Sequence, residues 1–170
     1  MKQTAHAIAD DQFEDDLYNY GMSHYLAYIL LAAGVGACFA VQASANSKLR
    51  LNLGSPMWAA CFSICGTFIT AITAMLILRP QSPTGEVLRG TPWWNWIGGP
   101  LGALIVLGGA ALVSELGAAL FIALVVSGQL LCSLLLDHFA LLGLQEQPIT
   151  MGRVLGAALV VAGVVCMKYL

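Results

Sequence analysis

The chain alternates long apolar stretches with short polar segments. Each stretch is close to the ~20 residues with which a helix crosses a ~30 Å hydrocarbon core. The stretches lack the polar stripe of a soluble amphipathic helix and the strict alternation of an outer-membrane β-strand. Because backbone groups inside a bilayer must be hydrogen-bonded within the protein, the pattern predicts an all-α integral membrane protein with five transmembrane helices. The predicted spans are residues 24–47, 57–79, 93–113, 117–137 and 151–168.

Composition supports a membrane location for residues 24–170. Charged residues make up 9% of the chain and hydrophobic residues 59%, whereas a soluble domain carries about 25% charged residues. Residues 1–23 differ, because they hold a cluster of acidic side chains at Asp10, Asp11, Glu14, Asp15 and Asp16. We expect this segment to be a solvated, poorly ordered arm. It is either a dispensable extension or a docking segment.

The sequence contains no motif typical of an enzyme, a cofactor site or a metal site. A phosphate-binding loop, an HExxH helix and a nucleophile elbow are all absent. Cys61 and Cys65 are four residues apart, but no histidine or third thiol lies near them in the sequence, so we expect them to pack rather than to bind metal. The net charge of −2 includes no basic cluster suited to nucleic acid. We therefore expect no enzymatic activity, no cofactor, no metal and no nucleic-acid partner.

Lysine and arginine residues near the membrane are evenly divided between its two sides. With five spans, the two termini lie on opposite faces. Three such residues lie close to a span on the face of the N-terminus: Arg79, Arg89 and Arg153. Three others lie close to a span on the opposite face: Lys48, Arg50 and Lys168. An excess of these residues on one face orients a membrane protein, and here there is none. The balance predicts copies inserted in both orientations, although a shift of one boundary would break the tie and leave a single orientation.

An inverted second copy would solve a geometric problem. Five helices can scarcely surround a pathway, whereas two oppositely inserted copies provide ten helices related by a two-fold axis in the membrane plane. Many secondary transporters are built from inverted repeats of this kind, with the substrate site near the bilayer midplane. The sequence therefore predicts half of an inverted-repeat assembly.

Polar side chains within the spans are the candidates for a substrate pathway, because a buried amide or carboxylate in lipid is costly without a partner. Gln129, Ser133 and Asp137 follow one another at four-residue spacing on one face of the fourth span. Gln42 and Asn46 have the same spacing in the first span. Such amides can instead form hydrogen bonds between helices. We favour that alternative for Asn46, and a simple interfacial position for Asp137.

Glycine pairs mark helix faces that can approach another helix closely. Gly98 and Gly102 form a GxxxG pattern in the third span, and Gly152 and Gly156 form another in the fifth. Packing within one chain and packing between two copies would use these glycines equally. We expect helix packing at these positions, and the sequence does not separate the two forms of it.

Three segments together resemble one known family. They are GQLLCSLLLDHFALLG at residues 128–143, GSP at 54–56 after Gln42 and Asn46, and PWWNWIGG at 92–99. In this order they resemble the five-helix YdcZ-like family of the drug/metabolite transporter superfamily, over residues 26–170. Two positions depart from the family pattern. Ala140 stands where a glycine is usual, and Ser114 and Glu115 stand where a proline tends to precede Leu-Gly. The second departure concerns the link between the third and fourth spans, where we expect Glu115 to be solvated.

The resemblance implies a bacterial inner-membrane protein whose helices pair antiparallel with a second copy or with a five-helix paralogue. Larger members of the superfamily have ten helices in two inverted halves and are mainly exporters of small metabolites or drugs. We therefore expect a secondary transporter that exports a small metabolite or drug-like molecule by alternating access. Asp137 would carry the proton if transport is coupled to protons. The expected substrate pathway comprises Gln42, Asn46, Gln129, Ser133 and Asp137.

Two other classes of protein stay open at the level of sequence. A small antiparallel dimer can form a dual-topology ion channel, whose flux would not saturate with concentration. A non-transporting scaffold or accessory subunit could use the acidic arm as its contact. Deletion of residues 1–22 would abolish the function of such a scaffold, whereas a transporter should tolerate it.

Overall fold

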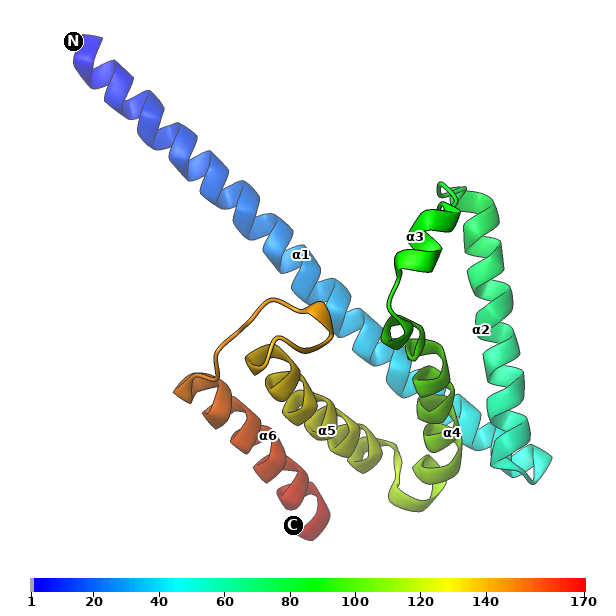
Figure 1. Ribbon diagram of the computed structural model, residues 1–170. Coiled ribbons are helices and arrows are strands. Elements are labelled where there is room, and N and C mark those ends of the chain that lie inside the picture. Colours follow the sequence, from blue (N-terminus) through cyan, green and yellow to red (C-terminus); the bar gives the residue numbers. More distant parts are fainter. Residues whose placement is uncertain (1) are drawn as a thin grey trace. The chain divides into compact units, whose positions relative to one another are not determined.

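The computed structural model describes the backbone of residues 2–170 and the side chains of residues 22 and 24–170. These residues contain helices and no strand. In chain order, the elements are α1 (Lys2–Leu53), α2 (Pro56–Leu78), α3 (Gly85–Gly90), η1 (Trp93–Trp96), α4 (Gly98–Leu116), α5 (Ala118–His138), η2 (Leu141–Gly143) and α6 (Met151–Tyr169) (Figure 1).

Five helical segments are long and apolar enough to cross a membrane. They are His24–Leu53, Pro56–Leu78, Trp93–Leu116, Ala118–His138 and Met151–Tyr169. This confirms the all-α membrane fold with five spanning helices that the hydrophobic pattern predicted. The pairing of this unit with an inverted second copy stays a prediction.

The first spanning segment continues past Ser47, where the sequence suggested its end, to Leu53. The charges at Lys48 and Arg50 do not end the helix, because such side chains place their charged heads at the membrane surface while the backbone stays helical. Gly54 ends it instead, with a φ of 70°. Ser55 then caps α2, since its hydroxyl accepts a hydrogen bond from the backbone N–H of Trp58.

The link between α4 and α5 is shorter than the sequence suggested. Ser114, Glu115 and Leu116 belong to the last turn of α4, and Gly117 alone separates the two helices. Gly117 has φ 79° and ψ 149°, a conformation that is open essentially to glycine only. The chain therefore reverses direction at a single residue, and α4 and α5 pack against each other as antiparallel neighbours.

The chain divides into two units, one up to Val41 and one from Gln42 to Leu170. The first unit consists of the greater part of α1. The side chains of residues 2–21 and 23 lie outside the described part of the chain, and so do the acidic residues that we expected to form a poorly ordered arm. That expectation stays a prediction.

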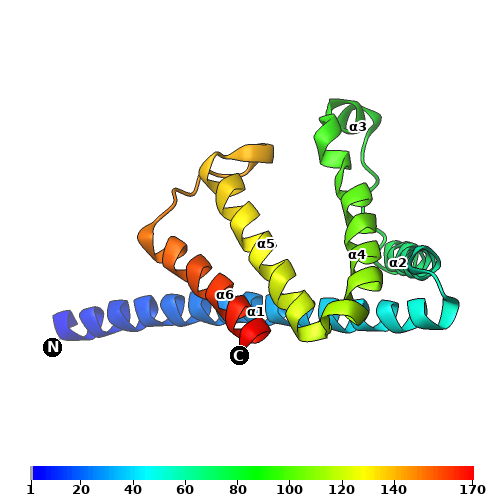
Figure 2. The same ribbon diagram turned by 90° about the horizontal axis from the view of Figure 1, so that it is seen from below.

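Within the second unit, α2 packs on α4, α4 on α5, and α5 on α6. The antiparallel α5 and α6 lie side by side in both ribbon views (Figures 1 and 2). The buried side chains are mostly small, as expected where membrane helices approach closely. The buried hydrophobic residues are Ala43, Ala59, Ala60, Ala110, Val113, Phe121, Ala157 and Val164. Each spanning helix thus has packing partners on part of its circumference only.

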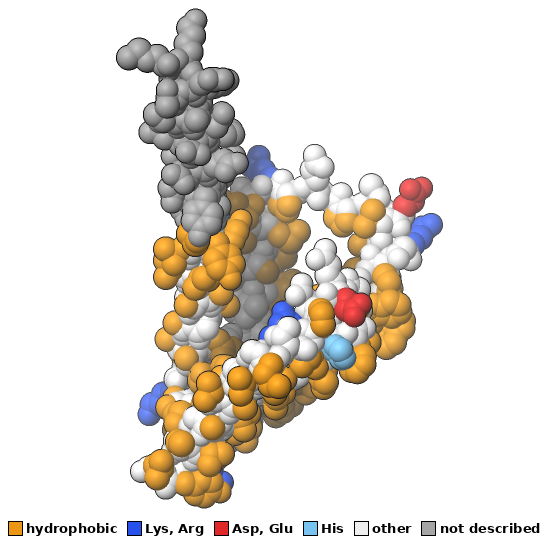
Figure 3. Space-filling model, turned by 90° about the vertical axis from the view of Figure 1, so that its left-hand side faces the viewer, with side chains coloured by type: hydrophobic (Ala, Val, Ile, Leu, Met, Phe, Trp, Pro, Cys, Tyr) orange, Lys and Arg blue, Asp and Glu red, His pale blue; other side chains and the backbone are white. Residues whose placement is uncertain are grey.

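Large hydrophobic side chains cover much of the surface of the described residues (Figure 3). In water such a surface would aggregate, whereas in a bilayer it faces lipid or another membrane protein. Examples on successive helices are Phe68, Leu104, Leu135 and Leu159, which are all exposed. The surface therefore agrees with a membrane location.

Candidate functional site

A first cleft lies between α2 and α4, beside Gln42 of α1. Its volume is about 440 Å³, and no charged side chain lines it. Gln42 is half-buried and contributes an amide that can both donate and accept hydrogen bonds. The Thr67 hydroxyl also lines the cleft and donates to the Ser63 carbonyl oxygen at 3.0 Å. The complete lining is Gln42, Ile64, Thr67, Phe68, Ala71, Gly98, Gly99, Gly102, Ala103 and Val106.

Asn46 lies one helical turn after Gln42 and joins α1 to α2. Its Nδ2 donates a hydrogen bond to Ser63 Oγ at 3.0 Å. Asn46 is 7% exposed and the adjacent Ser47 is 4% exposed, so the bond is shielded. Hydrogen bonds between membrane helices contribute about 0.6 kcal/mol on average. Asn46 thus makes the kind of contact expected of a packing residue, and its place in a substrate pathway stays a prediction.

The crossing of α1 and α4 depends on Gly109, which the sequence did not single out. A Cβ added to Gly109 would lie 3.3 Å from the Ala43 Cβ and 3.5 Å from the Ala43 Cα. Both Ala43 and Gly109 are buried. Because Ala43 directly follows Gln42, this close contact holds Gln42 beside the cleft between α2 and α4.

The four glycines that we expected to pack helices make no such contact among the described residues. An added Cβ at Gly98, Gly102, Gly152 or Gly156 would have nothing within 4 Å. Gly98 and Gly102 line the first cleft instead. The helix-packing role of these four glycines, within one chain or between two copies, stays a prediction.

Arg50 of α1 binds the end of α4. Its Nη1 donates to the Ala111 carbonyl oxygen at 2.7 Å, to the Ser114 hydroxyl, and to Glu115 Oε1 at 3.2 Å. The C-terminal end of a helix carries partial negative charge, so a cation is favoured there. The Glu115 side chain is 65% exposed. It is therefore solvated, as expected, and also ion-paired, which was not foreseen.

A second cleft, of about 410 Å³, lies between α5 and α6. Asp137 Oδ2 is 3.6 Å from Arg153 Nη1, and the two side chains are 34% and 35% exposed. A partly exposed ion pair of this kind contributes at most ~1 kcal/mol. The Asp137 carboxylate nevertheless has a positive partner beside it. The complete lining is Leu130, Ser133, Leu134, Asp137, Arg153, Gly156, Ala157 and Val160.

The link after α5 ties the two helix ends together. Gln147 donates its backbone N–H to the Asp137 carbonyl oxygen at 2.9 Å. In turn, Arg153 donates to the carbonyl oxygen and to the side-chain oxygen of Gln147, both at 3.3 Å. Thr150 caps α6, since its hydroxyl accepts from the Arg153 N–H at 3.4 Å. Arg153, which the sequence presented only as a topology charge, therefore belongs to the site.

The stripe of Gln129, Ser133 and Asp137 is divided in the structure. Ser133 and Asp137 line the second cleft, and the Ser133 hydroxyl donates to the Leu130 carbonyl oxygen at 2.9 Å. Gln129 is exposed and lines neither cleft. Eight residues turn an α-helix about 80° past two full turns, and this rotation carries Gln129 away from the cleft. The sequence-predicted residues thus form two groups, Gln42 with Asn46 and Ser133 with Asp137, and Gln129 lies apart from both.

The described residues contain no group of three or more histidine, cysteine or acidic side chains that could hold a metal ion. The five cysteines are free and exposed. Cys61 and Cys65, which we expected to pack, lie exposed on α2.

Five apolar spanning helices, with charged side chains gathered at their ends, define the chain as a multi-pass membrane protein. Residues 27–166 match the sequence profile of the family described as "Putative inner membrane exporter, YdcZ". The chain belongs to this family. It is also 27% identical, over 134 residues, to "Inner membrane protein YdcZ" of Escherichia coli (strain K12), an alignment that covers 79% of this chain and 88% of that protein. No solved structure matches the chain.

The family confirms the resemblance seen in the sequence and the inner-membrane location. The description of the family supports a membrane-transport role for the chain.

Proposed function

We propose that two copies of this chain, inserted in opposite orientations, form a secondary transporter that exports a small metabolite or drug-like molecule by alternating access. The exporter family supports the transport role. The partner is a second copy or a five-helix paralogue, and the charge balance favours a second copy. The expected pathway residues are Gln42, Asn46, Gln129, Ser133 and Asp137. Gln42 lines the first cleft, Ser133 and Asp137 line the second, and Gln129 would complete the pathway at the contact between chains.

The observation that carries the proposal is the exposed amide of Gln129. It lies in the middle of α5 (Ala118–His138), on a helix that already packs against α4 and α6. It has no hydrogen-bond partner among the described residues. A primary amide at this depth would lose its water partners and gain none from lipid, which is unfavourable. A second chain that covers this face of α5 would supply polar partners or a water-filled pathway.

The distribution of positive charge supports the opposite orientation of the second chain. Arg50 and Arg153 are engaged in ion pairs with Glu115 and Asp137. If these two are left out of the topology count, Arg79 and Arg89 remain on one face and Lys48 and Lys168 on the other. The tie therefore holds with or without the paired arginines, so neither orientation is favoured by the positive-inside rule.

The orientation of the C-terminus in cells tests the assembly. A single cysteine replaces Leu170 in a variant whose five native cysteines are changed to serine, and an impermeant thiol reagent labels it from outside. We expect about half of the molecules to be labelled, because the charge count gives no preference. Two differently tagged copies should also co-purify. Uniform sidedness without an inverted partner would exclude the proposed assembly.

Flux through reconstituted liposomes tests the pathway. Export of substrates from a panel of small metabolites and dyes should saturate with concentration, whereas unsaturated flux with single-channel currents would identify a channel. We expect Gln129→Leu to reduce flux without reducing the yield of folded protein. Val126→Leu is the matched control, since Val126 is also exposed on α5. Loss of folded protein in Gln129→Leu would instead make Gln129 a packing residue.

A further variant addresses proton coupling. In the proposed transporter, protonation of Asp137 would remove the negative charge beside Arg153 and free the guanidinium. Asp137→Asn should therefore abolish any acceleration of flux by a proton gradient. Unchanged proton-coupled flux in this variant would take Asp137 out of the coupling mechanism.

A further inference from the structure

We infer that the cleft between α5 and α6 binds a small zwitterion, with the carboxylate of the ligand on Arg153 and its ammonium group on Asp137. The inference rests on the proposed function, because it names a class of molecule that the transporter would carry. Its basis is that opposite charges from two helices line one cleft.

The Arg153 guanidinium has unused capacity to bind a carboxylate. It carries five N–H donors, but its contacts with Gln147 are 3.3 Å long and its contact with Asp137 is 3.6 Å long. Good charge-assisted hydrogen bonds are about 2.7–2.9 Å long, and arginine prefers to bind a carboxylate through two of them at once. A ligand carboxylate can therefore improve on the present partners of Arg153.

The helix ends favour the same placement of charges. Arg153 is in the first turn of α6 (Met151–Tyr169), where unpaired N–H groups give the backbone a partial positive charge. Asp137 is in the last turn of α5, the end of the helix that carries a partial negative charge. An anion is thus favoured at the α6 side of the cleft, and a cation at the α5 side.

Charge balance selects a zwitterion over a singly charged ligand. A ligand with only a carboxylate would take Arg153 and leave Asp137 without a positive partner, and a ligand with only an ammonium group would do the reverse. An unpaired charge in a partly buried site is unfavourable. Because Asp137 and Arg153 are 3.6 Å apart, the two charges of the ligand must also be close together, as they are in an α-amino acid.

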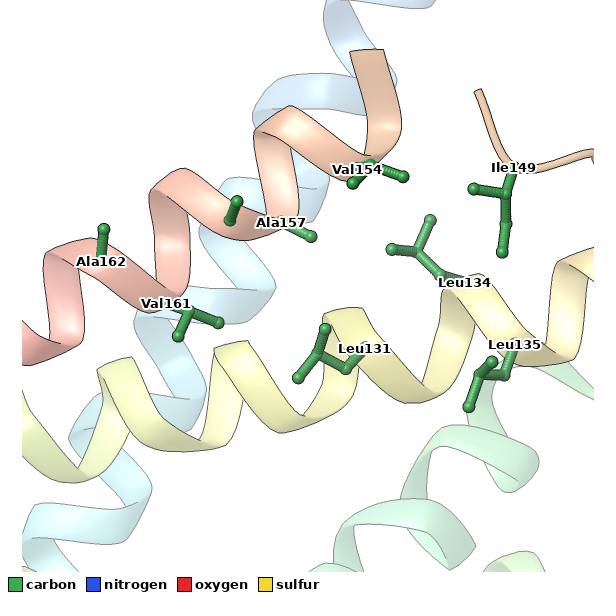
Figure 4. Close-up of a pocket in the computed structure, with 9 residues that line it drawn as sticks. Leu131, Leu134, Leu135, Ile149, Val154, Ala157, Val161 and Ala162 are labelled. Atoms are coloured by element: carbon green, nitrogen blue, oxygen red, sulfur yellow. The ribbon is translucent and has the colours of Figure 1, made fainter. Parts of the chain in front are cut away.

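The remainder of the ligand faces aliphatic side chains. Leu130, Leu134, Ala157 and Val160 line the charged cleft beside Asp137 and Arg153. A separate apolar groove of about 610 Å³ lies on the opposite face of the same two helices, because the groove and the cleft share only Leu134 and Ala157. Figure 4 shows side chains of α5 and α6 on the walls of this groove, with Ile149 of the link at one end. An aliphatic side chain therefore fits beside the charged pair within the cleft itself, and the cleft suits an aliphatic α-amino acid.

Binding to the purified full-length protein tests the inference. The probes are leucine, N-acetylleucine, which lacks the ammonium group, and leucinamide, which lacks the carboxylate. Isothermal titration should give a Kd for leucine at least about tenfold lower than for either derivative, since each derivative loses one charge-assisted contact. Equal affinity for all three, or no binding of leucine, would overturn the inference and leave the ion pair as a clamp between α5 and α6.

Substitutions in the cleft between α5 and α6 test whether leucine binds there. Asp137→Asn and Arg153→Gln should each weaken leucine binding about tenfold or more. Glu115→Gln and Arg50→Gln are matched controls, because that ion pair has the same chemistry and does not line the cleft. The controls should keep the wild-type Kd, and an equal loss in controls and cleft variants would overturn the inference. If a single variant fails to fold, the double variant Asp137→Asn with Arg153→Gln leaves no unpaired charge, and it should fold without binding leucine.

The outcomes for the assembly and for the ligand are separable. An antiparallel dimer that shows no leucine binding would refute the zwitterion site alone. Chains that all have one orientation and no inverted partner would refute the proposed transporter, whatever their affinity for leucine.

Discussion

The contact of Gly109 with Ala43 gives a sharp test of how α1 is held against α4. Replacing Gly109 with alanine adds one methyl group where an ideal Cβ would be 3.3 Å from the Ala43 Cβ. That separation is tighter than ordinary van der Waals contact, so α1 or α4 must shift by a few tenths of an ångström. The same shift would disturb Gln42 and Asn46, which α1 presents to α2.

Two effects of opposite sign determine how far Gly109→Ala changes the free energy of unfolding. Alanine is a better helix former than glycine by up to ~1 kcal/mol, although much of this gain is lost in a bilayer, where the separated helices are already helical. Overpacking a tight contact costs about 1–3 kcal/mol. We therefore expect Gly109→Ala to lower the free energy of unfolding by about 1 kcal/mol or more.

Gly108→Ala is the matched control for this prediction. Gly108 is the neighbouring residue of α4, and nothing lies within 4 Å of a Cβ added there. This variant should be as stable as the wild type or up to ~1 kcal/mol more stable, since only helix propensity changes. A swap provides a second control. In Gly109→Ala with Ala43→Gly, the new methyl group meets the Cα of residue 43 at 3.5 Å and Phe121 Cζ at 4.0 Å, which are both ordinary van der Waals contacts, so most of the lost stability should return.

The assay is reversible unfolding of the protein in mixed micelles with increasing sodium dodecyl sulfate, followed by circular dichroism or tryptophan fluorescence. The wild type, Gly109→Ala, Ala43→Gly and the swap form a double-mutant cycle, in which the coupling between positions 43 and 109 should be about 1 kcal/mol. A Gly109→Ala variant as stable as Gly108→Ala, or a swap no more stable than Gly109→Ala alone, would refute the close crossing of α1 and α4.

Three further predictions concern the loops, the α1–α2 contact and the topology. Ala140 has a φ of 48°, which costs an L-residue about 1–2 kcal/mol, so Ala140→Gly should raise the stability by about 1 kcal/mol; an unchanged midpoint in the same assay would contradict this. A double-mutant cycle of Asn46→Ala and Ser63→Ala should give a coupling near 0.6 kcal/mol and no more than about 1.7 kcal/mol; zero coupling would mean that their hydrogen bond is not formed. Gln81→Lys with Ser82→Lys breaks the charge tie, so most C-termini should become accessible from outside; a labelled fraction that stays at half would refute the balance argument.

The fold was predictable because the bilayer restricts the secondary structures that a chain can adopt inside it. A span must be helical and about 20 residues long, so hydropathy alone identified the five described helical segments that can cross a membrane. The ends of the spans were less predictable. Lys48 and Arg50 suggested an early end of the first span, but the helix ends at Gly54, where the backbone turns left-handed. A helix-breaking glycine such as Gly54 therefore indicates the end of a helix better than a charged side chain does.

The sites were predictable only in part, because four-residue spacing places side chains near one another without saying which neighbour they face. Ser133 and Asp137 share a cleft, whereas Gln129 has rotated out of it. The sequence could have indicated that Arg153 is the partner of Asp137. A short link between two spans makes them antiparallel neighbours, and this puts Arg153, in the first turn of α6, opposite the last turn of α5.

The contact at Gly109 was hidden for a different reason. Gly108 and Gly109 are adjacent glycines, and the sequence does not indicate that Gly109 rather than Gly108 lies against Ala43. Likewise, the left-handed conformation of Ala140 explains why a glycine suits this position, which the sequence marked only as a departure from the family pattern. Local sequence thus indicates where contacts can form, and tertiary geometry selects among them.

The two ion pairs among residues 24–170 explain why an inverted partner suits a transporter better than a parallel one. Arg50 with Glu115 lies just before the start of α5, and Asp137 with Arg153 lies at its end, so one pair is at each face of the membrane. The pairs differ in their surroundings, because Asp137 and Arg153 line the cleft between α5 and α6 whereas Arg50 and Glu115 do not. A parallel dimer would place both charged clefts on the same face. An antiparallel dimer gives each face one pair of each kind, so that the inward-open and outward-open states are related by symmetry, as alternating access through inverted repeats requires.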